Sequence, residues 1–241
     1  MKDFTVDKEF WEIFPDVTIG VLALSDVKET GSVDETEAVE IEQLLMKANR
    51  EAEKYLESDT ISENEVVAVW RKAYQKFPTK KGARCSIEAL LKRVLHGKPV
   101  GSIFPPVDIT NAISLKYALP IGVEDVDKLE GGLKLGVMKG DEHFLPIGSE
   151  TEEPPLAGEV AYYDDFGAVC RCFNWRDGQR TQVNDNTTNE VVLMECVDPE
   201  RVEDLKKAVK ELSELMVKYL DAKVVAMEFV DKNSGAVKIS E

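Results

Sequence analysis

The order of apolar and polar positions predicts a buried strand followed by helices in the first half of the chain. Residues 17–24 are short, apolar and rich in β-branched side chains, which is typical of a buried strand. Three runs with apolar residues at helical spacing follow, and they predict helices over about residues 32–56, 62–77 and 86–97.

The predicted helix boundaries depend on capping residues and prolines. The capping boxes Ser32-x-x-Glu35 and Ser62-x-x-Glu65 each precede one of the helical runs. Further along, Pro105-Pro106 predicts an extended segment, and Asp108 is placed to cap a short helix after it. The first half of the chain is therefore expected to be rich in helix.

The second half has the pattern of strands and turns, with one long helix near its end. The helix is predicted from Asp198-Pro199 to about Leu220. Strands are predicted at residues 133–138, 144–147, 159–163, 168–175 and 191–197, with a closing hairpin formed by 224–230 and 236–239. The pattern predicts an α+β fold in which a helix-rich N-terminal half packs on a mixed or antiparallel sheet, within a single domain of residues 1–241.

Composition narrows the class of protein. Apolar residues make up 43% and charged residues 32% of 241, which is ordinary for a globular protein. Charges interrupt every short apolar run near the N-terminus, so we expect a cytoplasmic protein without a membrane partner. The thiols are expected to be reduced. No metal or other cofactor is expected, because Cys170-x-Cys172 lacks a second close pair and His96 and His143 are far apart in sequence.

The distribution of charge singles out one segment. A net charge of −16 argues against broad nonspecific binding of nucleic acid. Residues 71–98, however, contain nine lysines and arginines, among them Lys80, Lys81, Arg84 and Arg93, and only one acid, Glu88. This segment is either a surface that faces phosphates or a solvated helix surface.

Glu195 is the clearest candidate for a functional side chain. It lies in the apolar run 191–197, where strand alternation places it beside Val191 and Leu193. A buried carboxylate must be paired, protonated or reserved for a ligand. A structural ion pair with Arg171 and contact with a ligand are both compatible with this pattern.

Two other segments carry polar side chains in informative settings. If residues 168–175 form one strand, Arg171, Phe173 and Trp175 share a face on which a base or a phosphate could bind, although both aromatic residues are equally compatible with the core. Thr110 and Asn111 follow Asp108 where a loop meets a helix, a suitable place to bind a ligand or a water molecule. The chain has no nucleophile elbow, phosphate loop, dinucleotide fingerprint or zinc-protease helix.

Several short motifs are distributed along the chain, namely Arg84-x-Ser86-x-Glu88-Ala89-Leu90-Leu91-x-Arg93, Val107-Asp108-Ile109-Thr110-Asn111, Leu119-Pro120-x-Gly122, Gly158-Glu159, Cys170-Arg171-x-x-Asn174-Trp175-Arg176 and Thr187-Thr188-Asn189 with Glu195. Taken together, these motifs resemble one family, the free-standing relatives of the B3/B4 editing domain of the phenylalanyl-tRNA synthetase β subunit. The resemblance covers about residues 60–230, so residues 1–60 are interpreted as an N-terminal extension.

The resemblance implies a B3/B4-like fold and an editing hydrolase that acts in trans on the 3′-terminal ester of mischarged aminoacyl-tRNA, binding the acceptor end. It implies that Asn111, Thr110 and Arg171 act in hydrolysis or orient water. The acceptor end would be bound by the basic residues Lys80, Lys81, Arg84 and Arg93. Glu195 would read the side chain of the amino acid, and the other residues expected to bind the substrate are Gly122, Asn174, Trp175 and Arg176.

One difference from the synthetase domain bears on specificity. Gly122 stands where that domain has a histidine shortly after its Thr-Asn pair, so selectivity for tyrosine is not expected to carry over. The alternative function is a noncatalytic module that binds tRNA or a protein and uses the acidic segment before residue 65 as its interaction surface. A homodimer is compatible with either function.

Overall fold

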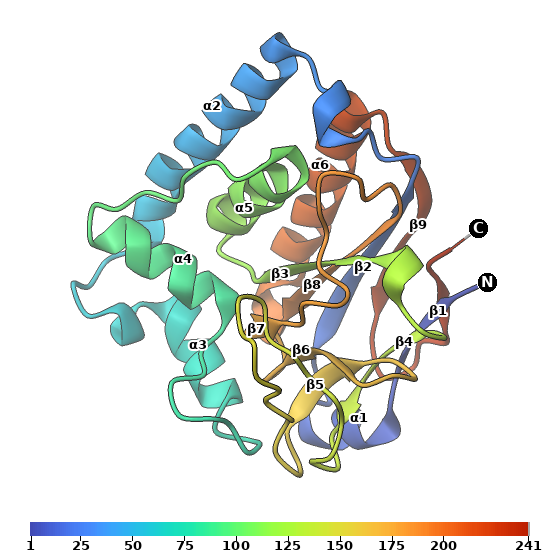
Figure 1. Ribbon diagram of the computed structural model, residues 1–241. Helices are drawn as coiled ribbons and strands as arrows, with labels where there is room; N and C mark the ends of the chain where they lie inside the picture. Colours follow the sequence, from blue (N-terminus) through green and yellow to red (C-terminus); the bar gives the residue numbers. More distant parts are fainter. Residues whose placement is uncertain (241) are drawn as a thin grey trace.

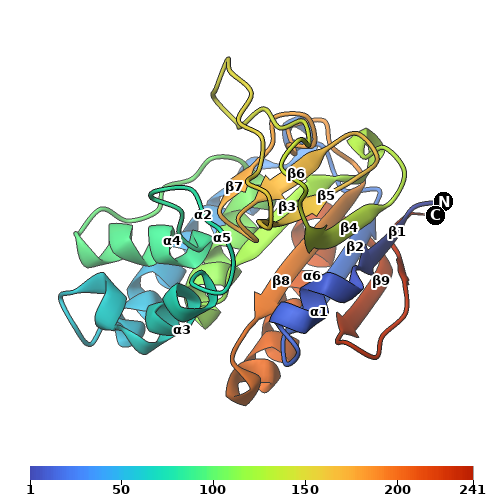
Figure 2. The same ribbon diagram turned by 90° about the horizontal axis from the view of Figure 1, so that it is seen from below.

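The computed structural model describes residues 1–240 and has an α+β fold with two sheets (Figures 1 and 2). The helices are α1 (Lys8–Ile13), α2 (Glu35–Glu51), α3 (Glu65–Ala73), α4 (Ser86–Leu95), α5 (Pro105–Tyr117) and α6 (Val202–Leu220). The strands are β1 (Asp3–Val6), β2 (Thr18–Ser25), β3 (Ile121–Asp125), β4 (Leu133–Val137), β5 (Val160–Tyr163), β6 (Ala168–Arg171), β7 (Arg176–Asp177), β8 (Glu190–Cys196), β9 (Lys223–Val230) and β10 (Val237–Lys238).

The two sheets differ in topology. The smaller sheet has the strand order β3-β8-β2-β9 and is antiparallel throughout. The larger sheet has the order β10-β1-β4-β5-β6-β7 and is mixed, because β1 and β4 run parallel. The predicted fold class, with mixed and antiparallel pairing, is confirmed.

The four-stranded sheet lies between helices and the second sheet. On one face, Leu22, Val192 and Met194 belong to an apolar cluster with residues of α5 and α6 such as Ile109 and Leu212. The opposite face carries Val21, Val191 and Leu193, which belong to a second cluster together with Leu135 and Tyr162 of the larger sheet. A side chain on this second face of β8 therefore points into the layer between the sheets, as expected for Glu195.

The first 60 residues are built into both sheets. Strand β2 lies between β8 and β9 in the smaller sheet, and β1 lies between β10 and β4 in the larger one. The two ends of the chain meet there: the Lys2 amide donates to Ser240 Oγ at 2.7 Å, and the termini are adjacent in both views (Figures 1 and 2). The predicted closing hairpin is wrong, because β9 pairs with β2 and β10 pairs with β1.

Several predicted boundaries also need correction. The capping box of α2 is formed by Asp34 and Glu37, two residues after the predicted one. The prolines at 105 and 106 do not form an extended entry but occupy the first turn of α5, where their missing N–H groups would have no helical acceptor. Residues 144–147 do not form a strand, and within this segment Pro146 alone makes an isolated bridge, to Gly178.

Two further observations concern the chain as a whole. Among residues 1–240, none of the helices combines the length and apolar character needed to cross a membrane. All four cysteines, at 85, 170, 172 and 196, are free thiols, and all are buried.

Candidate functional site

Glu195 lies on β8, with its side chain only 1% exposed, in the layer between the two sheets. The Tyr162 hydroxyl donates to its Oε1 at 2.6 Å, and Asn174 Nδ2 donates to its Oε2 at 3.0 Å. Both partners come from the larger sheet and its loops. The ion pair with Arg171 that the sequence left open is not formed.

Asn174 reaches Glu195 because the backbone reverses before it. Strand β6 ends at Arg171, and Cys172 and Phe173 both adopt left-handed backbone conformations, with φ of 48° and 67°. Few non-glycine residues adopt such angles. The prediction of one strand over residues 168–175 is therefore wrong, because the chain turns back so that Cys170 pairs with Asp177 across a short hairpin.

The turn is stabilised by packing of Phe173. Its side chain is completely buried and meets Phe10, Phe14 and Trp70 at ring-centroid distances of 5.4, 5.5 and 5.5 Å. Burial of this ring supplies stabilisation that offsets the unfavourable backbone angles. Because Phe173 faces the aromatic cluster, Asn174 is left to face Glu195.

The amide of Asn174 is held in a defined orientation. Tyr74 Oη donates to its Oδ1 at 3.0 Å, while its Nδ2 donates to Glu195. Burial raises the pKa of Glu195 to about 7, and the hydrogen bonds from Tyr162 and Asn174 act in the opposite direction. The carboxyl group therefore changes its charge close to neutral pH.

Glu195 lines a small inner cavity of about 40 Å³ between the sheets. The acidic side chains Glu124 and Asp177 line the same cavity, together with Gly122 and Ser86. Trp175, Tyr162 and Asn174 also line it, so two residues expected to bind the substrate, Asn174 and Trp175, are found at this cavity.

A larger outer cavity of about 300 Å³ adjoins the inner one. It is lined by Thr110 and Asn111 of α5 and by Gln182. Three residues line both cavities: Ile121, Gly122 and Asp177. The structure therefore brings six residues expected at the site to two adjacent cavities, namely Thr110, Asn111, Gly122, Asn174, Trp175 and Glu195.

The side chains of the outer cavity differ in their freedom to bind a ligand. Thr110 Oγ1 donates to the carbonyl oxygen of Val107 at 2.9 Å, so its proton is already used. The side-chain amides of Asn111 and Gln182 form no hydrogen bond with any residue from 1 to 240. These two amides are the available donors of the outer cavity.

Arg171 lies in a structural ion pair and lines neither cavity. Its guanidinium contacts both carboxylate oxygens of Glu159, at 2.9 and 2.7 Å, and donates to the carbonyl oxygen of Glu153 at 2.7 Å. Arg171 and Glu159 are 1% and 0% exposed. The expectation that Arg171 acts directly in hydrolysis is therefore not supported, because its charge is neutralised by Glu159 away from the cavities.

Arg176 also lies outside both cavities. It is 3.7 Å from a carboxylate oxygen of Glu153, which additionally pairs with Lys80. The Arg176 guanidinium also lies 6.0 Å from the ring of Trp175. Arg176 therefore lies beside the site and not within it.

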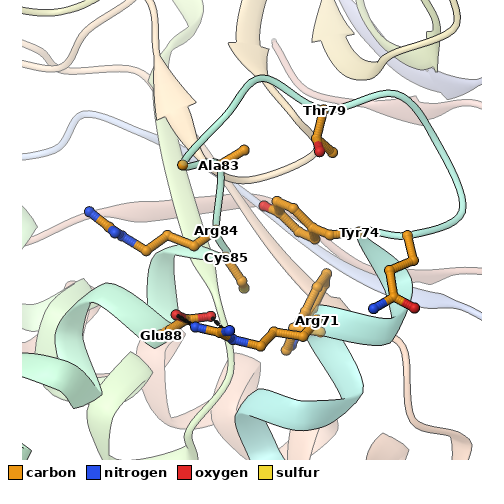
Figure 3. Close-up of a pocket in the computed structure, with 10 residues that line it drawn as sticks. Arg71, Tyr74, Thr79, Ala83, Arg84, Cys85 and Glu88 are labelled. Atoms are coloured by element: carbon orange, nitrogen blue, oxygen red, sulfur yellow. Dashed lines mark hydrogen bonds and ion pairs between the residues drawn. The ribbon is translucent and has the colours of Figure 1, made fainter. Parts of the chain in front are cut away.

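A third cavity of about 390 Å³ lies between α3 and α4, at the basic segment (Figure 3). Figure 3 shows Arg71 directed at Glu88, and the distance between the charged groups is 2.6 Å. Arg84 lines this cavity and, like Lys81, is exposed and forms no ion pair with residues 1–240. Tyr74, whose hydroxyl donates to Asn174, lines this cavity too.

The other two basic residues expected to bind tRNA have partners within the protein. Lys80 pairs with Glu153, and Arg93 donates to the carbonyl oxygen of Pro99 at 3.2 Å. Both side chains are nevertheless exposed. Of the four, Lys81 and Arg84 are the ones whose charges are fully available to a phosphate.

Four residues of the site were not predicted from the sequence: Glu124, Tyr162, Asp177 and Gln182. Glu124 has a local signal, since it alternates with Gly122 along the short strand β3, for which no strand was predicted. The remaining three are brought to the site by the pairing of strands and by loops. No local pattern marks them.

Comparison with known proteins relates the chain to one family. A family model described as the B3/4 domain matches residues 69–228. The phenylalanine–tRNA ligase beta subunit of Nocardia farcinica is 35% identical over 106 residues, which are 44% of this chain and 12% of that protein. The same subunit of Fusobacterium nucleatum is 29% identical over 120 residues, which are 50% of this chain and 14% of that protein.

A solved structure is also similar over most of the chain. It is an N-terminal fragment of the phenylalanyl-tRNA synthetase β subunit from Pyrococcus horikoshii, with a TM-score of 0.48 and 11% identity, and the match covers 92% of this chain and 49% of that one. The matched segments span only 12% and 14% of the two curated relatives.

Proposed function

The chain belongs to the B3/4 domain family, and from this premise we propose that it is an editing hydrolase that deacylates mischarged aminoacyl-tRNA in trans. The observation that carries the proposal is that the two cavities are adjacent and share part of their lining. Glu195 lines the inner one, Asn111 lines the outer one, and Gly122 and Asp177 belong to both. The ester bond of the substrate would lie at this junction.

The sizes of the cavities suit the two ends of such a substrate. The outer cavity, at about 300 Å³, is at the lower end of the range for small-molecule sites and would receive the terminal adenosine. The inner cavity, with Glu195 at its wall, would receive the side chain of the amino acid. Gly122 lines both cavities without adding a side chain, and a Cβ built there meets no atom within 4 Å.

Hydrolysis at the junction requires a positioned water molecule and stabilisation of negative charge. The water oxygen forms a bond to the carbonyl carbon and gives up a proton, the bond from that carbon to the ribose oxygen breaks, and the ribose oxygen takes up that proton. Asn111 and Gln182 offer free amide N–H groups to the oxyanion that develops in between. No protein nucleophile is needed, because the α-ammonium group already activates the ester and binding supplies the orientation.

Glu195 is proposed to select the amino acid rather than to act as the general base. Both its oxygens already accept a hydrogen bond from Tyr162 or Asn174, and it faces the inner cavity. Asp177, which lines both cavities, is better placed to accept the α-ammonium group at the junction. Its carboxylate is proposed to hold the ester in position.

The acceptor end of the tRNA would be bound at the basic surface formed by Lys80, Lys81, Arg84 and Arg93. Lys81 and Arg84 carry charges without partners in residues 1–240, and Arg84 lines the cavity of Figure 3. Contacts of lysine and arginine with phosphates release counterions and make binding depend on salt.

Deacylation is tested by incubating the purified protein with a panel of aminoacyl-tRNAs and measuring the remaining ester. The proposal expects a shorter half-life for at least one mischarged species, and loss of this effect in Asn111→Ala. If no ester in the panel is hydrolysed faster than in buffer, the protein is not a deacylase.

The alternative function, a noncatalytic module that binds tRNA, is favoured by one observation: the free charges of Lys81 and Arg84 lie outside both site cavities. It predicts tRNA binding without loss of ester. In a salt titration, Lys81→Gln and Arg84→Gln should each lower the slope of log K against log salt by about 1. Lys232→Gln, an exposed lysine beyond β9, serves as the control.

A further inference from the structure

The residues that line the inner cavity restrict which amino acid the substrate can carry. We propose that it accepts a short amino-acid side chain ending in a hydrogen-bond donor, such as the hydroxyl of serine or threonine, and excludes aromatic side chains. The inference rests on the proposed function, because it assumes that the amino acid of an aminoacyl ester enters this cavity. The size of the cavity, its free acceptors and its charge support it in turn.

Size limits what can enter. A water molecule needs roughly 10–15 Å³ of such space, so a cavity of about 40 Å³ admits only a group of about three water-sized units. Its walls include the rings of Tyr162, Phe173 and Trp175, and Phe173 is completely buried in the aromatic cluster. A phenol ring would have to displace these side chains, whereas a hydroxymethyl or hydroxyethyl group fits.

Two buried polar atoms of residues that line the inner cavity have no hydrogen-bond partner among the residues that the structure describes. Glu124 is only 2% exposed, and within residues 1–240 its Oε2 has no hydrogen-bond partner. Ser86 Oγ, on the first residue of α4, is also buried without a partner in the part of the chain described. Both residues line the inner cavity. Buried polar atoms without partners are costly, so these two atoms favour a ligand that supplies hydrogen bonds.

The cavity is rich in acceptors and has no basic side chain in its wall. Glu124, Asp177 and Glu195 all line it, and no lysine, arginine or histidine does. Burial raises the pKa of Glu124 well above its usual value, which favours the protonated form that donates as well as accepts a hydrogen bond. The three carboxyl groups are not arranged as a set of metal ligands. A hydroxyl group on an organic ligand, which can both donate and accept a hydrogen bond, therefore matches this cavity.

Strand geometry explains how these acceptors meet. Gly122 and Glu124 lie two residues apart on one face of β3, and they pair with Leu193 and Val191 of β8. Glu195 follows on the same face of β8. Ser86 is brought in by its own amide, which donates to the carbonyl oxygen of Asn174 at 3.1 Å.

Selectivity against aliphatic side chains follows from the same free atoms. An alanyl group would fit by size but would leave Glu124 Oε2 and Ser86 Oγ without partners. Sites that hydrogen-bond a hydroxyl group discriminate strongly against analogues that lack it. We expect seryl or threonyl esters to be hydrolysed at least ~100-fold faster than alanyl esters, and tyrosyl esters to be poor substrates.

The test measures hydrolysis of seryl-, threonyl-, alanyl- and tyrosyl-tRNA. In parallel, calorimetry measures binding of 3′-amide-linked seryl and tyrosyl adenosine, which cannot be hydrolysed. Glu124→Gln should reduce the preference for seryl over alanyl esters at least ~10-fold, while Glu200→Gln, an exposed residue, should leave it unchanged.

The outcomes separate this inference from the proposed function. Hydrolysis of tyrosyl esters as fast as seryl esters overturns the inference and leaves the deacylase function standing. If no ester is hydrolysed but the seryl analogue binds more tightly than the tyrosyl one, the selectivity of the cavity is supported and the deacylase function is lost. Absence of both hydrolysis and discrimination overturns the two together.

Discussion

Asn174 donates a hydrogen bond from Nδ2 to Oε2 of Glu195 at 3.0 Å, across the layer between the two sheets. The Tyr162 hydroxyl donates to the other oxygen, and Tyr74 holds the amide of Asn174 from behind. The carboxyl group is thereby fixed in position while it faces the inner cavity. Such support from neighbouring hydrogen bonds is what a selective site requires.

The pKa of Glu195, raised by burial to about 7, predicts a pH-dependent preference for the substrate. Only the carboxylate form accepts a hydrogen bond through both oxygens. The ratio of seryl to alanyl hydrolysis should therefore increase as the pH rises through about 7. Using a ratio cancels the general dependence of ester hydrolysis on hydroxide.

Two variants check the assignment of this pH dependence to Glu195. In Glu195→Gln the change of the ratio near pH 7 should disappear. In Tyr162→Phe, loss of a hydrogen bond that lowers the pKa of Glu195 should move the midpoint to higher pH. Glu57→Gln, an exposed residue, should behave as the unmodified protein. A midpoint that persists in Glu195→Gln would assign the pH dependence to another group.

Asn111→Ala should lower the rate of deacylation by about 10²–10³-fold, the usual cost of removing one donor to an oxyanion. The free energy of unfolding should hardly change, because the Asn111 side chain makes no hydrogen bond within residues 1–240. Asn233→Ala is the matched control on an exposed turn. A rate unchanged in Asn111→Ala would remove this residue from the mechanism.

Gly122→Val should abolish deacylation and preserve the fold. A Cβ at this position meets no atom within 4 Å, and a β-branched residue suits a strand, so urea unfolding should be similar to that of the unmodified protein. The side chain would nevertheless occupy the junction of the two cavities. As a contrast, a Cβ at Gly20 would lie 2.5 Å from Val209, so Gly20→Ala should lose about 1–3 kcal/mol of stability.

Arg171→Met should lower the free energy of unfolding by about 3–5 kcal/mol, because it leaves the fully buried Glu159 without its ion-pair partner. Denaturant unfolding measures this loss. The double variant Arg171→Met, Glu159→Leu should recover much of the stability, since it removes both charges. Recovery of deacylation along with stability would confirm that Arg171 acts only through the fold.

Glu190 is completely buried, and within residues 1–240 neither carboxyl oxygen has a hydrogen-bond partner. Burial, with a contribution from the nearby Asp125, raises its pKa from 4.5 to about 8. The folded protein thus holds a proton that the unfolded chain releases near pH 4.5. The contribution of this side chain to the free energy of unfolding is therefore fully present below about pH 4.5. It is lost as the pH rises from about 4.5 to about 8, and the loss is at most about 1.4 kcal/mol per pH unit.

Glu190→Gln should remove this loss. The variant and the unmodified protein should have similar free energies of unfolding at pH 4.5, and the variant should be the more stable by a few kcal/mol at pH 8.5. Urea unfolding at a series of pH values provides the measurement. A difference that does not depend on pH would show that Glu190 is already charged in the folded protein.

Local patterns predicted much of the fold correctly. The buried strand near residues 18–25, the central strand that carries Glu195, and the long helix after Pro199 were all found, because their apolar spacing is strong and continuous. The patterns did not predict the reversal at Cys172 and Phe173, since its left-handed backbone is held by aromatic packing from distant segments.

The sequence by itself determined that Glu195 is buried on β8 and, through motifs, the family to which the chain belongs. Only the tertiary structure decided which side chains contact one another. Arg171 pairs with Glu159 rather than with Glu195, and Glu195 accepts hydrogen bonds from Tyr162 and Asn174. Alternation along a strand states which face a side chain occupies, but not what lies opposite. That depends on how two sheets assembled from distant segments pack together, and the cavities around Glu195 exist only as a result of that packing.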